Sequence, residues 1–179
     1  MIKKIITVVM LVFASLTARA EFVSATIGVD GLTCSMCAKG VEESLKQLDF
    51  IENVKIDLNK LIATINFKKN SIVEIDKLRE MIEDAGFSVR SLETTFNFEN
   101  TSVGKDFHYI YGGNTYHFIG TKEQTLSGPV NLRFVDKEFV NKREFGELVK
   151  KTKFECYTKG IASNCCKTEG HLYHVTIRT

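Results

Sequence analysis

Two cysteines three residues apart are the residues of this sequence with the clearest chemistry. Cys34 and Cys37 lie in the segment 31–37 (GLTCSMC), where a turn is predicted to enter an amphipathic helix. At a helix N-terminus a thiolate is stabilised by unpaired backbone N–H groups and by the positive end of the helix dipole. Because the thiolate is the form of cysteine that binds metal, this spacing predicts a site for a soft metal ion.

The elements that would position this pair follow from the apolar pattern of residues 24–94. Apolar residues alternate over 25–29, 54–56 and 61–67, as in half-buried strands, and recur at helical spacing over 38–48 and 75–85. A turn is predicted at 58–60, a capping box of Ser71 and Glu74 before the second helix, and Gly86 at that helix's end. With a last strand near 87–92, this order predicts a ferredoxin-like βαββαβ domain.

The second half of the chain has a different composition, which predicts a second domain. Residues 95–104 are rich in turn-forming residues and are predicted to be a linker between a domain at 21–94 and a small β-rich domain at 105–179. That domain is predicted to hold a hairpin with its turn at 112–114, a strand at 130–134, a helix capped by Asn141 and Glu144, and strands at 154–158 and 172–177. The predicted class is α+β, and this order of elements is compatible with an OB-like barrel.

Residues 24–94 resemble a heavy-metal-associated domain, on the segment GLTCSMC and on Asp84-Ala85-Gly86-Phe87. This family includes copper chaperones, N-terminal domains of copper-exporting ATPases and the periplasmic mercury-binding protein. The resemblance implies that Cys34 and Cys37 are the metal ligands and that Phe87 packs beside their sulfurs. Leu32 replaces the methionine usual at that place, and an apolar leucine should preserve the loop.

The chemistry of two thiolates favours Cu(I), with Hg(II) as the second choice. Zinc usually takes four ligands, and Thr33 stands where zinc-preferring members of the family tend to have an acid. The resemblance further implies transfer of the ion by thiolate exchange with a metal-transporting ATPase or another donor or acceptor protein. No catalytic chemistry is required, so the chain is not expected to be an enzyme, and it is expected to be a monomer or a dimer that shares one ion.

Two other functions stay open for the cysteine pair. A thiol–disulfide redox protein also uses a C-x-x-C pair at a helix start, although this chain has no tryptophan and only one proline, Pro129, in its other half. A structural adaptor acting through residues 105–179 is the other alternative. A purely structural Cys34–Cys37 disulfide would close a very short loop and would stabilise little.

The N-terminal residues predict export. Lys3 and Lys4 precede an apolar run at 5–16, and Ala18-Arg19-Ala20 fits the small-x-small rule for signal cleavage. The run is shorter than the about 20 residues of a membrane-spanning helix. Residues 1–20 are therefore predicted to be a signal peptide that is cleaved. The mature protein would be periplasmic or otherwise exported, and it would not be inserted in the membrane.

The charge of the remaining chain argues against nucleic acid as a partner. Residues 21–94 carry a net charge of −4 and residues 95–179 a net charge of +3. A charge of this size, in an exported protein, is not the basic surface that a nucleic-acid-binding domain needs.

Three further cysteines and four histidines lie in the second half. Cys156 is expected to form a disulfide with Cys165 or Cys166 in an oxidising compartment, or the three thiols form a second soft-metal site. His108 and His117 flank the predicted hairpin turn and could face each other across it. His171 and His174 would point to opposite faces of a strand and should not converge on one ion; each histidine is expected to be solvated or hydrogen-bonded.

Overall fold

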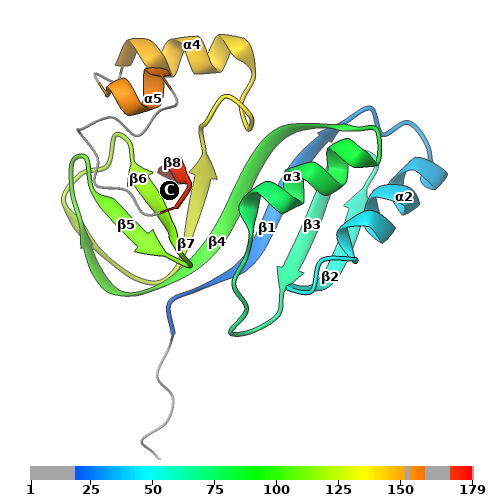
Figure 1. Ribbon diagram of the computed structural model, residues 1–179, viewed down its shortest axis with the longest axis horizontal. Coiled ribbons are helices and arrows are strands. Elements are labelled where there is room, and N and C mark those ends of the chain that lie inside the picture. Colours follow the sequence, from blue (N-terminus) through cyan, green and yellow to red (C-terminus); the bar gives the residue numbers. More distant parts are fainter. Residues whose placement is uncertain (1–18, 152–153, 160–169, 179) are drawn as a thin grey trace, which may run out of the picture.

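The computed structural model describes residues 19–151, 154–159 and 170–178. The predicted signal peptide, apart from its last two residues, and the pair Cys165 and Cys166 lie outside the described residues. Within these ranges eight strands form one sheet, in the order β2-β3-β1-β4-β7-β8-β6-β5 (Figure 1). The strands are β1 (Glu21–Asp30), β2 (Ile51–Asp57), β3 (Ile62–Phe67), β4 (Ser88–Val103), β5 (His108–Tyr111), β6 (Asn114–Phe118), β7 (Gln124–Phe134) and β8 (Leu172–Arg178). The helices are α2 (Ser35–Leu45), α3 (Ile75–Asp84), α4 (Lys142–Lys151) and α5 (Glu155–Lys159).

The first half of the chain has the predicted ferredoxin-like order of elements. Strands β2, β3, β1 and the start of β4 are neighbours and pair antiparallel, and α2 and α3 cover one face of them (Figure 1). The helices bury the apolar stripes seen in the sequence, with Val41 and Leu45 on α2 and Leu78 and Ile82 on α3 fully buried. The four-stranded sheet with two helices therefore follows from the two apolar periods.

The predicted capping box at α3 is wrong. The N-cap of α3 is Glu74, which makes no side-chain capping hydrogen bond. The Ser71 hydroxyl instead donates to the backbone carbonyl of Lys68 at 2.6 Å, because the chain turns at residues 68–71 before it reaches the helix. The end of the helix is as predicted, since Gly86 has a φ of +88°, a conformation that favours glycine.

The predicted linker at 95–104 is also wrong, because these residues continue β4 to Val103. Phe96 and Phe98 point inward and are 1% exposed, while the asparagines and serine that suggested a linker lie between and after them. The pairing of β4 with β7 shifts register between Phe98 and Thr101, and Asn100 within this stretch has a φ of 41°. This is the stretch whose sequence looks most like a turn. The strand is bulged there but continues, so one sheet joins both halves of the chain.

The second half extends this sheet with β7, β8, β6 and β5. The predicted hairpin is present, with β5 and β6 pairing antiparallel and His108 opposite His117. Strand β8 inserts between β7 and β6, antiparallel to the first and parallel to the second. The described strands form an open row in which β5 and β2 are the edges, so the OB-like barrel is not confirmed.

One predicted helix is present here, and one predicted strand is a helix. The backbone N–H of Glu144 donates to the Asn141 side chain at 2.9 Å, which caps α4 at the predicted place. Residues 154–158 were predicted to form a strand, but 155–159 form α5. Adjacent Cys156 and Tyr157 are both buried; neighbouring side chains of a strand point to opposite faces, so a short helix lying on the sheet accommodates both.

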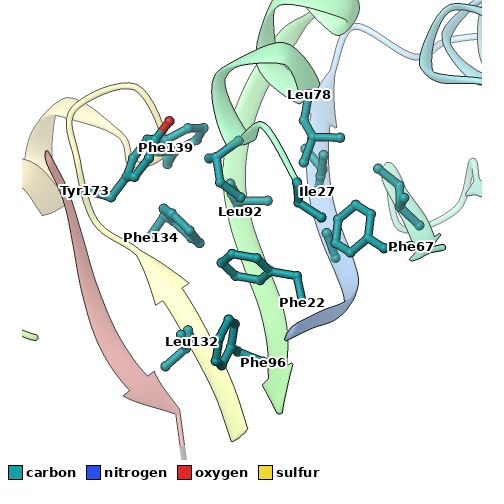
Figure 2. Close-up of a cluster of buried hydrophobic side chains, with 14 of the residues drawn as sticks. Phe22, Ile27, Phe67, Leu78, Leu92, Phe96, Leu132, Phe134, Phe139 and Tyr173 are labelled. Carbon is teal, nitrogen blue, oxygen red and sulfur yellow. The ribbon is translucent and has the colours of Figure 1, made fainter. Parts of the chain in front are cut away.

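A single hydrophobic cluster runs through both halves. Figure 2 shows side chains from β1, β3, α3, β4, β7 and β8 in one continuous layer that includes Phe22, Leu92, Phe96, Leu132 and Phe134. The Phe96 ring lies 4.8 Å from that of Phe22 and 4.9 Å from that of Tyr111, between centroids. Among the described helices, none has the length and apolar character needed to cross a membrane.

Candidate metal centre

The loop that carries the two cysteines begins with a glycine in a left-handed conformation. Strand β1 ends at Asp30 and α2 begins at Ser35, and Gly31 between them has a φ of +94°. A Cβ at this position would lie 3.3 Å from Cδ1 of Phe87. Glycine therefore lets the chain turn sharply out of β1 while the Phe87 ring lies against the loop.

Cys34 caps the helix with its own sulfur. Its backbone is extended, and its Sγ accepts a hydrogen bond from the backbone N–H of Cys37 at 3.3 Å. The Sγ atoms of Cys34 and Cys37 lie 2.8 Å apart. Cys34 is exposed and Cys37 is half-buried against the hydrophobic cluster, so the structure brings the two predicted ligands together at the surface.

The surroundings of Cys34 favour its thiolate. Its pKa is lowered from the ordinary value, first by the hydrogen bond from the Cys37 thiol and then by the backbone N–H of Cys37, with a smaller contribution from the N–H of Met36. The N–H groups of Cys37 and Met36 belong to the first helical turn, where backbone N–H groups have no partner within the helix. Since α2 has no acidic residue in its first turn, no carboxylate there opposes the negative charge.

The other predicted residues lie in the same loop or pack against it, and none of them is a strong metal ligand. Leu32 is 4% exposed and packs inward, as an apolar residue at this place should. Thr33 is exposed, and Phe87 is half-buried against the core and the Gly31 loop. Met36 lies between the two cysteines in the sequence and is 76% exposed. An ion held by the two sulfurs would therefore stay within reach of a second protein.

The profile of the heavy-metal-associated domain family matches residues 26–88, which include both cysteines and Phe87. This part of the chain is a heavy-metal-associated domain. The copper chaperone CopZ of Staphylococcus haemolyticus is 29% identical over 68 residues, which are 38% of this chain and 98% of that protein. A probable copper-transporting ATPase of Arabidopsis thaliana is 40% identical over 79 residues, which are 44% of this chain and 8% of the ATPase.

The similarity covers less than half of this chain. Among solved structures, a copper-binding domain of the P-type ATPase HMA7 is 32% identical, covers 38% of this chain and 90% of that domain, and gives a TM-score of 0.35. The chain matches only 8–10% of the length of the first two ATPases. The family match ends at residue 88, so most of β4 and everything after it lie outside the matched residues.

The structure brings together three residues of the second half whose proximity was not predicted from the sequence. Cys156 is buried on α5 beside His117 and His174, which are also buried. As predicted, His171 and His174 diverge: Nδ1 of His171 lies 3.2 Å from Asp76, whereas Nδ1 of His174 lies 2.6 Å from Asp136. Cys165 and Cys166, the other two thiols of the predicted disulfide or second site, lie outside the described residues.

His117 is hydrogen-bonded rather than solvated, since its Nδ1 lies 3.8 Å from the Sγ atom of Cys156. It is 0% exposed, and its Nε2 has no hydrogen-bond partner among the described residues. One signal in the sequence could have indicated this. His117 stands between Tyr116 and Phe118 in an aromatic strand, where a buried polar residue needs an explanation.

Alkylation of Cys34 is expected to stay fast at pH values where an ordinary cysteine is protonated, because its pKa is lowered in the folded protein. The lowered pKa contributes stability above the pKa of the unfolded chain, and this contribution is lost as the pH falls through the folded pKa. The rate of iodoacetamide modification, measured against pH by mass spectrometry of the Cys34 peptide, checks this. The denatured protein is the control, and equal midpoints in both states would contradict the expectation.

Proposed function

We propose that this protein binds Cu(I) between Cys34 and Cys37 and passes it to or from another protein by thiolate exchange. The observation that carries the proposal is the pair of sulfurs at the start of α2, with Cys34 exposed, its pKa lowered and both atoms within reach of one ion. Two thiolates are a ligand set for soft ions such as Cu(I). The relatives named as copper chaperone and copper-transporting ATPase support copper as the ion.

The mechanism needs only the two sulfurs and their exposure. The two sulfurs now lie 2.8 Å apart, closer than two metal–sulfur bonds of about 2.3 Å in a linear arrangement would place them. Cys34 is exposed and can rotate to widen this distance. A thiolate of the partner then attacks the ion, one sulfur of this protein leaves, and the ion moves through a state bound by three sulfurs. We propose this transfer as the activity, without a catalytic reaction on a substrate.

The proposed partner is a metal-binding domain of a copper-transporting ATPase or another copper donor or acceptor. The exposed Met36 between the ligands offers an apolar contact at the exchange site. Hg(II) is equally soft and remains the second candidate ion, since no described residue near the sulfurs discriminates between the two.

Transfer is tested by mixing the Cu(I)-loaded protein, without oxygen, with the apo metal-binding domain of a copper ATPase, in excess chelator that traps released copper. Copper should reach the acceptor faster than the chelator removes it from the loaded protein alone. Cys34→Ser/Cys37→Ser protein, incubated with the same copper, is the control and should deliver none above background. Delivery no faster than release to the chelator would overturn the transfer proposal.

We also propose that the protein acts outside the cytoplasmic membrane. The support comes from Lys3, Lys4, the apolar run and Ala18-Arg19-Ala20. Cleavage after Ala20 would fall directly before β1, which begins at Glu21, so removal of the leader would leave the sheet whole. The mass of the protein recovered from the periplasm should correspond to residues 21–179, and an uncleaved chain in the cytoplasm would contradict export.

A further inference from the structure

Three metal-binding side chains from distant parts of the sequence meet in the second half of the chain. They are His117 of β6, Cys156 of α5 and His174 of β8, and one donor atom from each lies within 4.8 Å of the other two. All three residues are buried, with exposed fractions of 0%, 0% and 2%. None of them lies in residues 26–88, which the family profile matches.

The sheet explains why the two histidines meet. Strands β6 and β8 are parallel neighbours, and His117 pairs with His174 in register. Residues at one register position of adjacent strands point to the same face, so both rings stand on the same side of the sheet. The short helix α5 brings Cys156 to that side, with its Sγ 3.8 Å from Nδ1 of His117. Metal bonds are about 2.0–2.1 Å long to nitrogen and about 2.3 Å long to sulfur. With these lengths, a distance of 3.8 Å between the two donor atoms corresponds to a nitrogen–metal–sulfur angle of about 120°.

One histidine is oriented in the way that metal-binding histidines usually are. The Asp136 carboxylate lies 2.6 Å from Nδ1 of His174 and also accepts a hydrogen bond from the backbone N–H of His174 at 2.9 Å. A carboxylate on one ring nitrogen fixes the tautomer and leaves the other nitrogen for a metal. That other nitrogen, Nε2, is buried and has no hydrogen-bond partner among the described residues.

The other histidine is buried against Cys156, with its Nδ1 3.8 Å from the Cys156 Sγ atom. Nδ1 of His117 and Nε2 of His174 are therefore the two nitrogens that a shared ion would use. Buried polar atoms are nearly always paired, and such an ion would pair Nε2 of His174.

Aromatic rings enclose the group. Phe154 lies edge-on to His117 at 4.8 Å and Tyr157 edge-on to His174 at 4.9 Å, while His108 stacks on His117 at 4.2 Å. The Tyr157 hydroxyl donates to the carbonyl of Val135 at 2.6 Å, so it is engaged elsewhere and does not complete the ligand set. The group is therefore covered by these rings, in keeping with its burial.

From these observations we propose that His117, Cys156 and His174 form a second, buried copper site. Two imidazoles and one thiolate in a three-coordinate arrangement are typical of copper. Structural zinc sites take four protein ligands, whereas three donors meet here among the residues that the structure describes. The proposal rests on these three donors and not on the proposed function of Cys34 and Cys37.

The two sites are separate in space. Helix α2 lies over one end of the eight-stranded sheet, whereas β6, β8 and α5 lie at the other (Figure 1). One ion therefore cannot be shared between them within a chain, and each site binds its own. Because exchange with another protein needs an exposed ligand, the buried site retains its copper, in contrast to the exposed pair.

The test removes the first site and asks whether copper still binds. The full-length Cys34→Ser/Cys37→Ser protein, reduced and without oxygen, is titrated with Cu(I) against a chromophoric chelator. One equivalent of copper should remain bound, and X-ray absorption should show nitrogen and sulfur together around it. Loss of all binding would overturn the proposal, and so would zinc displacing copper in a direct competition.

Further variants on the same background identify the ligands. Cys156→Ser and His174→Gln should each abolish the remaining copper, with circular dichroism showing that the protein is still folded. His171→Gln is the matched control, because His171 precedes the same strand but is exposed and paired with Asp76, and it should bind copper as before. Cys165→Ser/Cys166→Ser should also bind as before, and loss of copper in that variant would overturn this ligand set.

Asp136 is a positioning residue for this site, acting through His174. Asp136→Asn should weaken copper binding by about 10–100-fold, the usual effect of losing such a partner. It should also change the visible spectrum of protein that has been loaded directly with Cu(II), which a general loss of stability would not do. Glu138→Gln is the control, since Glu138 pairs with the exposed Lys137 instead. An unchanged affinity and spectrum in Asp136→Asn would contradict the assignment of His174 as a ligand.

Discussion

Replacing Phe96 with alanine is expected to lower the free energy of unfolding by about 3–5 kcal/mol, the usual cost of truncating a buried phenylalanine, and to destabilise both halves together. Phe96 is 1% exposed and lies in β4, the strand shared by the two halves. Its ring lies 4.8 Å from Phe22 in β1 and 4.9 Å from Tyr111 in β5. The cavity would therefore open where the first-half core meets the second.

The two halves can be followed by different probes. The chain has no tryptophan and its five tyrosines all lie between residues 109 and 173, so tyrosine fluorescence reports the second half. Hydrogen exchange in α2 and α3 reports the first. Both probes should show one transition, shifted equally by Phe96→Ala. Val23→Ala, next to Phe22 but 43% exposed, is the control and should change stability by no more than about 0.5 kcal/mol. Two separate transitions would show that the halves are independent domains.

The ferredoxin-like half could be predicted because its information is local. Each strand and helix has its own apolar period, and Gly31 and Gly86 stand at turns where a positive φ favours glycine. The two cysteines are only three residues apart, so their proximity followed from the sequence spacing alone.

Strand β4 was mispredicted because local turn signals conflict with pairing. Asn97, Asn100 and Ser102 suggest a break in the chain, yet Asn97 pairs with Pro129 and Ser102 with Thr125 on β7. The burial of Phe96 and Phe98 holds this strand in the sheet. A one-residue bulge absorbs the irregularity, and no pattern within the segment distinguishes such a bulge from a linker.

The buried group in the second half could not be predicted because it depends on long-range pairing. His117 and His174 meet only because β8 inserts beside β6 in parallel, with these two residues in register. Sequence periodicity indicates strands but contains neither their order nor their register. The prediction that His171 and His174 point apart is confirmed. The two histidines that come together, His117 and His174, belong to two different strands.

The loss of both sulfurs of the exposed pair is expected to have the largest effect on copper binding. On a Cys156→Ser background, which removes the proposed buried site, Cys34→Ser/Cys37→Ser should leave no measurable Cu(I) binding in anaerobic competition titrations. Each single variant should weaken binding by more than about a hundredfold, because the loss of an outer-shell partner alone costs about 10–100-fold and these residues are direct ligands.

This variant separates metal binding from folding unusually well. Cys34 is the N-cap of α2, and serine is among the best N-cap residues, so Cys34→Ser should keep or improve the start of the helix. Cys37 is half-buried in the first turn, and serine differs from cysteine there by a single side-chain atom. The unfolding midpoint should therefore change little while the copper affinity collapses. Thr33→Ala, at the exposed neighbouring position, is the control and should change neither.

The same titration distinguishes transfer from redox chemistry at this pair. A redox protein would need both thiols to reduce a model disulfide but would not require stoichiometric, tight Cu(I) binding. If the parent Cys156→Ser protein binds one copper tightly and the double serine variant binds none, the exposed pair is a metal site. If copper affinity is equally weak in both proteins while disulfide reduction depends on Cys34, the lowered pKa of that thiol serves redox exchange, and the copper proposal fails.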